Sequence, residues 1–492
     1  MKHIRKNYAK DALFRKIGLP FFLIGILLFS TCQEDDPADK IGEIQSINNW
    51  ILENMQTYYL WTDHIPKSTD KTLSPSDYFE TLIYDRKNID RFSWIQDDFI
   101  ELMNSIAGIN MEAGYDFQLY GLDNKNVNGY ITYIKPDSPA EKNGLHRGDL
   151  FTAINGQQIT YDNYQSLLTQ LSNQHTLGLV ATYGSLIITK TITLPVVNYA
   201  ENPILLDTVY TVQNKKIAYL VYNLFADDNG DNSNHYINEL NTTFGQFKSQ
   251  GINELIVDLR YNSGGTLSTT EALAAMISNR SASDLFGTEE YNTYLATALG
   301  KTYGADYNKT YFPNNIEKRD AHENIIEQTP INKLQGLSKV YFIVSGRTAS
   351  ASEILINGLR PYMNVKLIGE TTYGKNVGSI TIYEEDTEKQ KTNKWGMQPI
   401  IVRFTNAQGF SDFTNGFTPD VTASENPLQT RPLGDTDEYL LNIVLNEIQG
   451  NSLRSNNVNL KMNVIASSID MYPLRRNTFI PAHKVHKALF PK

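Results

Sequence analysis

Strand-length and helix-length hydrophobic patterns alternate along the second half of this 492-residue chain. The apolar runs predict a strand at 216–222, a helix at 233–250 and a second strand at 254–259. Alternation of this kind is typical of proteins in which helices cover a mostly parallel sheet. Residues 198–450 therefore predict an α/β layered core. Within it residues 280–335 look like an insertion, and residues 451–492 have no pattern that predicts a structure.

Two smaller units precede this core. Over residues 41–106 the apolar positions recur at helical spacing and predict a helical segment. Residues 110–195 alternate like strands, and Asn155-Gly156 predicts a tight hairpin. The expected fold class is multidomain α+β, with a β-rich domain between the helical segment and the α/β layered core.

The first 40 residues carry a different signal. Six basic residues precede the apolar run at 18–28, which is too short to span a bilayer comfortably and has the basic flank of an export signal. Cys32 is the only cysteine, so no intramolecular disulfide can form. We expect residues 1–31 to be a signal peptide, residues 32–40 to be a polar tether, and the remainder to lie outside the cytoplasm.

The chain is acidic, with a net charge of −10. Residues 1–31 hold six of the 44 Lys and Arg residues and one of the 54 Asp and Glu residues, so the remainder has a net charge of −15. A surplus of negative charge disfavours binding to nucleic acid. About 460 residues are enough for two or three domains with ample core.

Ser350 and Lys375 form the candidate catalytic pair. The apolar run 340–344 predicts a buried strand and a helical pattern begins at Ser352, so Ser350 would lie in the tight turn between them. Its oxygen would lie beside free helix N-terminal amides, which stabilise an oxyanion. A second strand, 365–368, ends in a loop that could bring Lys375 to the same sheet edge, where burial would lower its pKa and make it a base.

Each feature also has a simpler structural interpretation. Small Ser, Ala and Thr residues are common in turns, and the glycines within 262–265 accept loop conformations.

Residues 369–375 are similar to a phosphate-binding P-loop, but Asn376 stands where that loop needs Ser or Thr, and a strand-like pattern at 377–383 follows in place of a helix. The segment 322–326 lacks the second histidine of a zinc protease.

In order and spacing, these segments resemble the C-terminal processing peptidases, a family of Ser-Lys endopeptidases. The resemblance rests on Ser350-Ala351-Ser352-Glu353, on Gly374-Lys375 25 residues after the serine, and on the strand and turn at 257–265. It covers about residues 41–450 and implies a ClpP/crotonase-like core that needs no metal or cofactor. It also implies a Ser350 nucleophile, a Lys375 general base, and an oxyanion site formed by the amides of Ala351 and of Gly264 or Gly265.

Two positions depart from the family pattern. Ser379 stands where many members have a glutamine that orients the lysine, and Pro361 stands where some members have an acid. A serine can still accept a hydrogen bond from the lysine, so Ser379 is the candidate orienting residue. The alternative to an enzyme is a catalytically inactive peptide-binding scaffold of the same fold. An acyl-CoA enzyme on a related fold would need a nucleotide pocket that the sequence does not reveal.

Residues 110–195 resemble a PDZ domain, on the segments 129–134, 138–145 and 148–156. PDZ domains bind the C-terminus of a chain as an added strand, with loop amides around its carboxylate. The matching loop contains Tyr115, Asp116 and Phe117, and Asp116 stands where glycine is usual. Since the Asp116 carboxylate would repel that of a peptide, we expect internal extended segments to bind about as well as free C-termini.

Phe29-Ser30-Thr31-Cys32 resembles a bacterial lipoprotein signal, which implies that Cys32 is lipidated. The acidic residues 33–36 resemble signals that send some Bacteroidetes lipoproteins to the cell surface. These resemblances imply an outer membrane lipoprotein of the cell envelope, facing the periplasm or the cell surface. The overall expectation is an exported, lipid-anchored serine endopeptidase that cleaves unfolded or C-terminal protein segments. Its partners would be protein or peptide substrates and a membrane.

Overall fold

The computed structural model describes residues 37–320, 324–384, 393–426, 429–451, 463–471, 478–480, 485 and 488–489. The signal peptide and lipidation site expected within residues 1–32 lie outside this range. None of the described helices is both long and apolar enough to cross a bilayer. The described residues from Ile44 onward form one compact unit, and the following paragraphs concern this unit unless stated.

Helix α1 (Pro37–Tyr58) begins inside the stretch that we expected to be a tether. The expectation is wrong for residues 37–40, because proline is well tolerated at the first helical position, where its missing N–H has no partner to lose. The rest of the expected helical segment contains η1 (Thr62–His64), α2 (Pro75–Leu82), β1 (Trp94–Gln96) and α3 (Phe99–Ile106). Ile51, Met55 and Phe79 from these helices are completely buried in the main hydrophobic core.

The central sheet has six strands in the order β10-β11-β12-β18-β19-β24. All neighbours are parallel except β10 and β11, which form an antiparallel pair. The strands are β10 (Ile204–Val212), β11 (Lys215–Tyr222), β12 (Glu254–Asp258), β18 (Lys339–Val344), β19 (Asn364–Gly369) and β24 (Val421–Thr422). The sheet confirms the expected α/β core.

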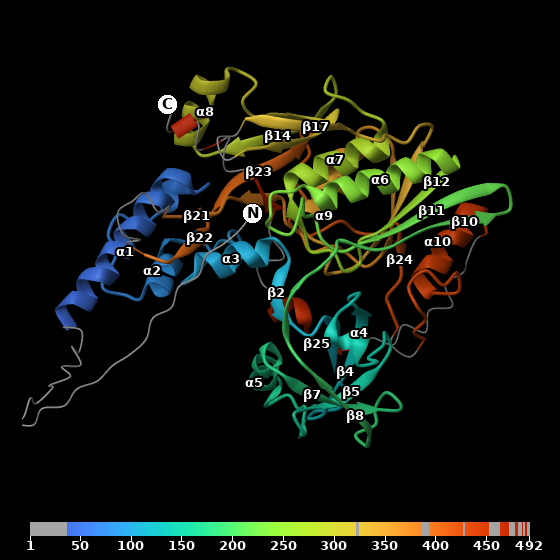
Figure 1. Cartoon of the computed structure of the whole chain (residues 1–492). Helices are drawn as coiled ribbons and strands as arrows, with labels where there is room; N and C mark the ends of the chain where they lie inside the picture. The colour runs from blue at the N-terminus through green and yellow to red at the C-terminus, as the bar shows by residue number, and fades with distance from the viewer. Residues whose placement is uncertain are drawn as a thin grey trace, which may run out of the picture. The chain divides into compact units, whose positions relative to one another are not determined.

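Both faces of this sheet are apolar because each is covered by helices. Along β11, Ala218 and Leu220 pack against α6, α7 and α9, whereas Ile217 and Tyr219 pack against α10. Figure 1 shows α6, α7 and α9 grouped together and α10 apart from them, near β10 and β24. These helices are α6 (His235–Gln250), α7 (Leu267–Ser278), α9 (Ala351–Leu359) and α10 (Tyr439–Gln449).

A second six-stranded sheet, in the order β13-β26-β20-β23-β14-β15, flanks the helices of the core. It contains β13 (Gly265–Thr266), β14 (Leu285–Tyr291), β15 (Lys309–Tyr311), β20 (Val377–Ser379), β23 (Ile400–Asn406) and β26 (Thr478–Phe479). Because β14 pairs with β23 over five residues, the region 280–335 contributes two strands, β14 and β15, to this sheet. The same region adds α8 (Thr293–Tyr303) and a hairpin of β16 (Asn315–Arg319) and β17 (Ile325–Pro330).

The strand-like stretch 377–383 is two strands and not one. β20 belongs to the second sheet, whereas β21 (Ile382–Tyr383) pairs with β22 (Gly396–Gln398), which in turn pairs with β1. The pairing of β20 with β23 shifts register between Gly378 and Ser379, and such a bulge bends a strand and ends its pairing.

The PDZ-like unit, residues 109–200, lies between the helical segment and the core. Strands β2 (Ile109–Glu112) and β9 (Val197–Ala200) pair at its two ends. Its sheet contains β3 (Tyr115–Gly121), β4 (Val127–Ile134), β5 (Leu150–Ile154), β6 (Gln157–Gln158), β7 (His175–Val180) and β8 (Ile188–Leu194), with α4 (Pro139–Lys142), α5 (Tyr164–Leu168) and η2 (Thr169–Ser172). Asn155 (φ +49°) and Gly156 (φ +75°) form the tight turn between β5 and β6, as predicted.

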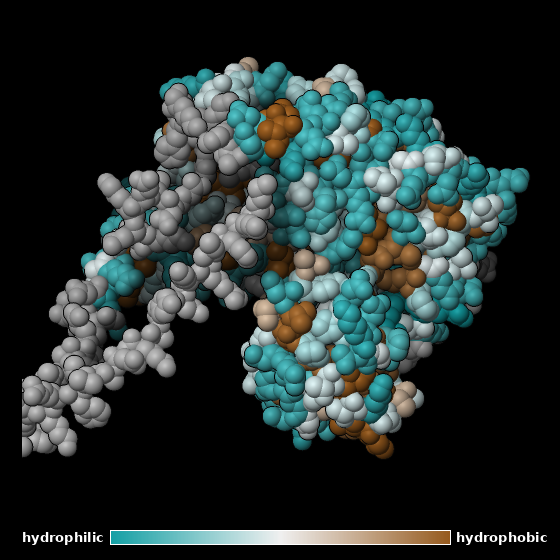
Figure 2. All heavy atoms as spheres, viewed as in Figure 1, coloured by the Kyte–Doolittle hydropathy of each residue, from teal (hydrophilic) through white to brown (hydrophobic). Residues whose placement is uncertain are grey.

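The tail beyond residue 450, which carried no sequence prediction, contains β25 (Asn463–Ser467), η3 (Ser468–Met471) and β26 among its described residues. β25 pairs with β3 of the PDZ-like unit. Figure 2 shows hydrophobic residues only in small separate groups on the face that it presents, which is ordinary for a protein surface.

Candidate active site

Ser350 lies in the tight turn between the end of β18 and the start of α9. Its backbone has φ +60° and ψ −115°, a conformation that costs a residue with a side chain about 1–3 kcal/mol. The surrounding chain holds this turn: the Thr348 hydroxyl donates to the Leu259 carbonyl at 2.8 Å. The Ala349 amide donates to the Asn262 carbonyl at 3.2 Å. A strained turn from strand to helix is typical of sites that present a nucleophilic serine.

Glu353 binds the backbone of both candidate catalytic residues. Its Oε2 accepts hydrogen bonds from the amides of Ser350 (2.9 Å) and Lys375 (2.8 Å). Its Oε1 accepts from the Gly374 amide (2.7 Å) and the Thr372 hydroxyl (2.6 Å). One buried carboxylate therefore fixes the Ser350 turn and the Lys375 loop against each other.

Burial raises the pKa of Glu353 to about 7, although the hydrogen bonds from the Thr372 hydroxyl and the three amides oppose the rise. Sequence reasoning did not assign this residue a role. A signal was present, however, because Ser-x-x-Glu before an apolar run is the capping-box pattern of a helix start, and Ser350 and Glu353 form that box at the start of α9.

Lys375 is completely buried. Burial lowers its pKa well below the usual value, while the nearby carboxylates of Asp90 and Glu353 oppose that change. The Lys375 Nζ lies 4.7 Å from the centre of the Phe92 ring. This environment favours the neutral amine, which is the form that can accept a proton.

The helical segment supplies part of this lysine environment, which the sequence did not predict. Asp90 is buried and accepts hydrogen bonds from the Tyr59 hydroxyl (2.8 Å) and from the amides of Phe92 (3.1 Å) and Ser93 (2.9 Å). The Arg91 guanidinium donates to the Gly374 carbonyl at 2.7 Å. No short sequence pattern marks the contact between Arg91 and Gly374, since it joins residues 283 positions apart.

The three residues predicted to form the oxyanion site lie around the same turn. Ala351 is the first residue of α9, so its amide is among those that have no carbonyl partner within the helix. The Gly264 amide already donates to Asn262 Oδ1 at 2.9 Å. A side chain at Gly265, which has φ +138°, would lie 1.9 Å from the Phe225 carbonyl oxygen. Between the two glycines, Gly265 is thus the better candidate, and the oxyanion role stays a prediction.

Ser379, the predicted lysine-orienting residue, is buried at the end of β20. Its carbonyl accepts a hydrogen bond from the Ile480 amide at 3.1 Å. It therefore lies next to the chain tail, and its action on Lys375 stays a prediction.

The sequence led us to expect Asp116 in an open loop, but the structure places it in a strand. Tyr115, Asp116 and Phe117 are the buried first residues of β3. The Asp116 carboxylate accepts two hydrogen bonds of 2.8 Å from Arg347 Nη2. Burial alone would raise the pKa of Asp116, but the ion pair with Arg347 outweighs it and keeps the pKa lowered.

Arg347 precedes Ser350 by three residues, so this ion pair joins the PDZ-like unit directly to the turn of the candidate nucleophile. The Arg347 side chain is only 7% exposed, and its Nε and Nη1 have no hydrogen-bond partner in the described structure. Removing either charge would leave the other one buried, which is costly.

The comparisons with known proteins match this organisation. The model of peptidase family S41 matches residues 216–423, that of the S41 N-terminal domain matches residues 46–94, and a PDZ domain model matches residues 130–180. This chain belongs to peptidase family S41.

Two curated relatives and one crystal structure are similar to this chain over about two thirds of its length or more. A CtpA-like serine protease of Staphylococcus epidermidis is 22% identical over 67% of this chain and 58% of its own length. A chloroplastic C-terminal processing peptidase of Tetradesmus obliquus is 25% identical over 66% of this chain and 62% of its own length. The chain thus spans less than two thirds of either relative. A crystal structure of an S41 protease from Bacteroides fragilis is 26% identical, with a TM-score of 0.63 over 82% of this chain and 97% of that one.

Two cavities adjoin the candidate active site around Ser350 and Lys375. One of about 560 Å³ lies at the carboxyl ends of the central strands, where Val344, Ser345 and Glu370 face Gln118 and Tyr120 of the PDZ-like unit. The other, of about 350 Å³, is lined by residues around Lys375, including Gly374 and Asn376 together with Arg91 and Phe92. Either is large enough to admit part of a peptide.

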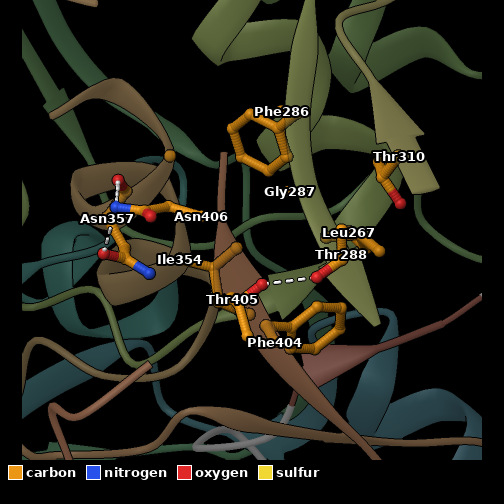
Figure 3. Close-up of a pocket in the computed structure, with 11 residues that line it drawn as sticks. Leu267, Phe286, Gly287, Thr288, Thr310, Ile354, Asn357, Phe404, Thr405 and Asn406 are labelled. Atoms are coloured by element: carbon orange, nitrogen blue, oxygen red, sulfur yellow. Dashed lines mark hydrogen bonds between the residues drawn. The ribbon is translucent and has the colours of Figure 1, made fainter. Parts of the chain in front are cut away.

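A third pocket has a structural role. Figure 3 shows side chains from α9, β14 and β23 around a space of about 10 Å³, which holds one water at most. Across it Asn406 donates to Asn357 (3.1 Å) and the hydroxyls of Thr288 and Thr405 are 2.5 Å apart. The asparagine contact joins β23 to α9, which carries Glu353, and the threonine contact joins β23 to β14.

Replacing Glu353 with glutamine should change how stability depends on pH. The raised pKa of Glu353 means that the folded state retains its proton longer than the unfolded state, so the stability from this group is greatest below about pH 4.5. It should fall by about 3 kcal/mol as pH rises to about 7. Urea unfolding of Glu353→Gln should lack that fall.

Glu370→Gln is the matched control, because Glu370 is exposed and accepts a bond from Ser424. It should unfold with the same pH dependence as the unaltered chain. An unchanged pH dependence in Glu353→Gln would contradict the assignment.

Proposed function

We propose that this chain is a serine endopeptidase that cleaves protein segments by a Ser-Lys mechanism. The observation that carries the proposal is the Glu353 carboxylate, which binds the amides of both Ser350 and Lys375 while burial keeps the lysine pKa low. A positioned serine and an amine whose lowered pKa favours its neutral form are the two groups that such a mechanism needs.

In the proposed reaction, neutral Lys375 takes the hydroxyl proton of Ser350 as the serine oxygen attacks the peptide carbonyl carbon. The amides of Ala351 and Gly265 stabilise the oxyanion of the tetrahedral intermediate. The lysine then gives its proton to the departing amine, which leaves an ester on Ser350. Water attacks this ester with Lys375 again as base, and the serine regains its proton.

An inactive scaffold of the same fold is less well supported. The strained backbone of Ser350 and the buried amine of Lys375 both lower stability. A peptide-binding scaffold would gain nothing from either, whereas strain and shifted pKa values are typical of catalytic sites.

The proposed substrates are unfolded or C-terminal segments of envelope or external proteins. A relative's name as a C-terminal processing peptidase and the PDZ match support this class. The proposed location is the outer membrane, through a lipid on Cys32, and rests on the sequence signal alone.

Ser350→Ala should abolish cleavage, with a loss of at least about 1,000-fold, because no other group can form the ester. An unstructured protein is incubated with each variant and fragments are followed by mass spectrometry. Ser249→Ala, at an exposed serine of α6, serves as the control and should cleave normally. Cleavage by Ser350→Ala at a comparable rate would refute this role for Ser350.

Lys375→Arg should be nearly as inactive as Lys375→Ala, because arginine stays protonated at any relevant pH. In the unaltered chain the cleavage rate should fall as pH drops through the lowered pKa of Lys375, since protonation removes the base. The measurement is kcat/KM between pH 5 and 10, with Lys366→Arg on the neighbouring strand as control. An active Lys375→Arg variant would point to a purely electrostatic role.

Cys32→Ala should move the protein from the membrane fraction to the soluble fraction of cells that express the full chain, because the expected lipid would have no attachment site. Metabolic labelling with a fatty-acid analogue provides the direct readout. Labelling that persists in Cys32→Ala would contradict the anchor.

A further inference from the structure

The peptide-binding edge of the PDZ-like unit is already occupied by the chain itself. β25 pairs antiparallel with β3, and the partners run from Asn463 opposite Gly121 to Ser467 opposite Gln118. Adding an extended segment to an exposed sheet edge is the way in which PDZ domains take their ligands. Ala466 is buried in the core of this unit, and Ile465 and Met471 pack against it.

The tail passes through the position where a bound C-terminus would end. Ser468 donates to the Asp116 carboxylate and accepts from the Phe117 amide at 3.3 Å. A peptide that ended here would place a carboxylate against Asp116, whereas the tail places a hydroxyl there and continues. Its fit therefore favours internal segments over free C-termini. Only about 20 Å³ of the groove beside Ser468, Met471 and His175 is empty.

The same tail returns in the catalytic core. Strand β26 pairs with β13 at Gly265 and with β20 at Ser379. It thus lies between the predicted oxyanion glycine and the strand that follows Lys375. Phe479 and Ile480 are buried there. With β26 in place, the edges of β13 and β20 are already paired and cannot accept a substrate strand.

Other features agree with a closed site. Ser350 and Lys375 have no exposed surface in this arrangement. The 560 Å³ cavity at the ends of the central strands is lined in part by Asn463 and Val464 of the tail. The ion pair between Asp116 and Arg347 connects the Ser468 contact to the turn that carries Ser350.

We propose that residues 463–471 are a tethered ligand of the PDZ-like unit and that, with residues 478–480, they act as an intramolecular inhibitor which a substrate must displace. The binding part stands by itself, and the inhibitory part rests on the proposed peptidase function. The displacing partner is an internal extended segment with apolar residues and a hydroxyl at the position of Ser468.

A reversible lock tests this inference. Gln118 and Ser467 are partners across β3 and β25, and antiparallel partners lie about 4.5–5.5 Å apart, within reach of a disulfide. In a Cys32→Ser background, the pair Gln118→Cys and Ser467→Cys should fix the tail when oxidised and release it when reduced. The probe is a fluorescent peptide of residues 463–471, and its binding is measured with Ser350→Ala added.

The oxidised form should bind this peptide at least about ten-fold more weakly than the reduced form, because a tethered ligand competes at high effective concentration. With Ser350 intact, cleavage of an unfolded protein should fall on oxidation and recover on reduction. The control lock is Glu317→Cys with Gln328→Cys, partners in the β16–β17 hairpin, which should change neither readout.

Equal binding by oxidised and reduced forms would overturn the proposal. If the lock changes binding but no form cleaves, the peptidase function fails and the tethered ligand stands. Should the cysteine pair prevent folding, Ser468→Asp provides a second test, since it sets two carboxylates against each other at Asp116. That variant should bind the peptide at least about ten-fold more tightly than the unaltered chain, with Ser468→Ala in between, and unchanged binding would equally refute the proposal.

Discussion

The arrangement of the site depends on a single buried carboxylate. Glu353 receives four hydrogen bonds, two from the amides of Ser350 and Lys375 and two from Thr372 and Gly374 in the loop that carries Lys375. It thereby links the strained turn after β18 directly to the loop after β19. A catalytic pair must be held within about half an ångström of its productive geometry. The hydrogen bonds of Glu353, which hold Ser350 and Lys375 relative to each other, are therefore as important for activity as the two reactive groups.

The parts around this carboxylate come from distant stretches of the chain. Asp90 and Phe92 of the helical segment surround the Lys375 amine, and the PDZ-like unit reaches the Ser350 turn through Asp116 and Arg347. The central sheet makes this convergence possible, because the carboxyl ends of its parallel strands meet at one edge. The groove of the PDZ-like unit is therefore connected, through Asp116, to Arg347, which precedes the candidate nucleophile by three residues.

Sequence patterns predicted β11, β12, β18 and β19, the helix α6 and the Ser350 turn, because each depends on residues that are neighbours along the chain. They also contained the sign of Glu353, in the capping box that opens α9. They could not reveal that Asp116 pairs with Arg347, 231 residues away. The same holds for β25 and β26, whose short strands are stable only because β3, β13 and β20 supply their partners.

The central claim is that Lys375 acts as a neutral base on Ser350, and the reactivity of the serine tests it most directly. A fluorophosphonate probe reacts with an activated serine and adds a defined mass, which peptide mapping assigns to one residue. The account predicts labelling at Ser350 with a rate that rises with pH through a midpoint well below 10.5, the usual pKa of lysine, and that is lost in Lys375→Met. Absence of labelling at Ser350, or a rate that ignores the lysine substitution, would contradict it.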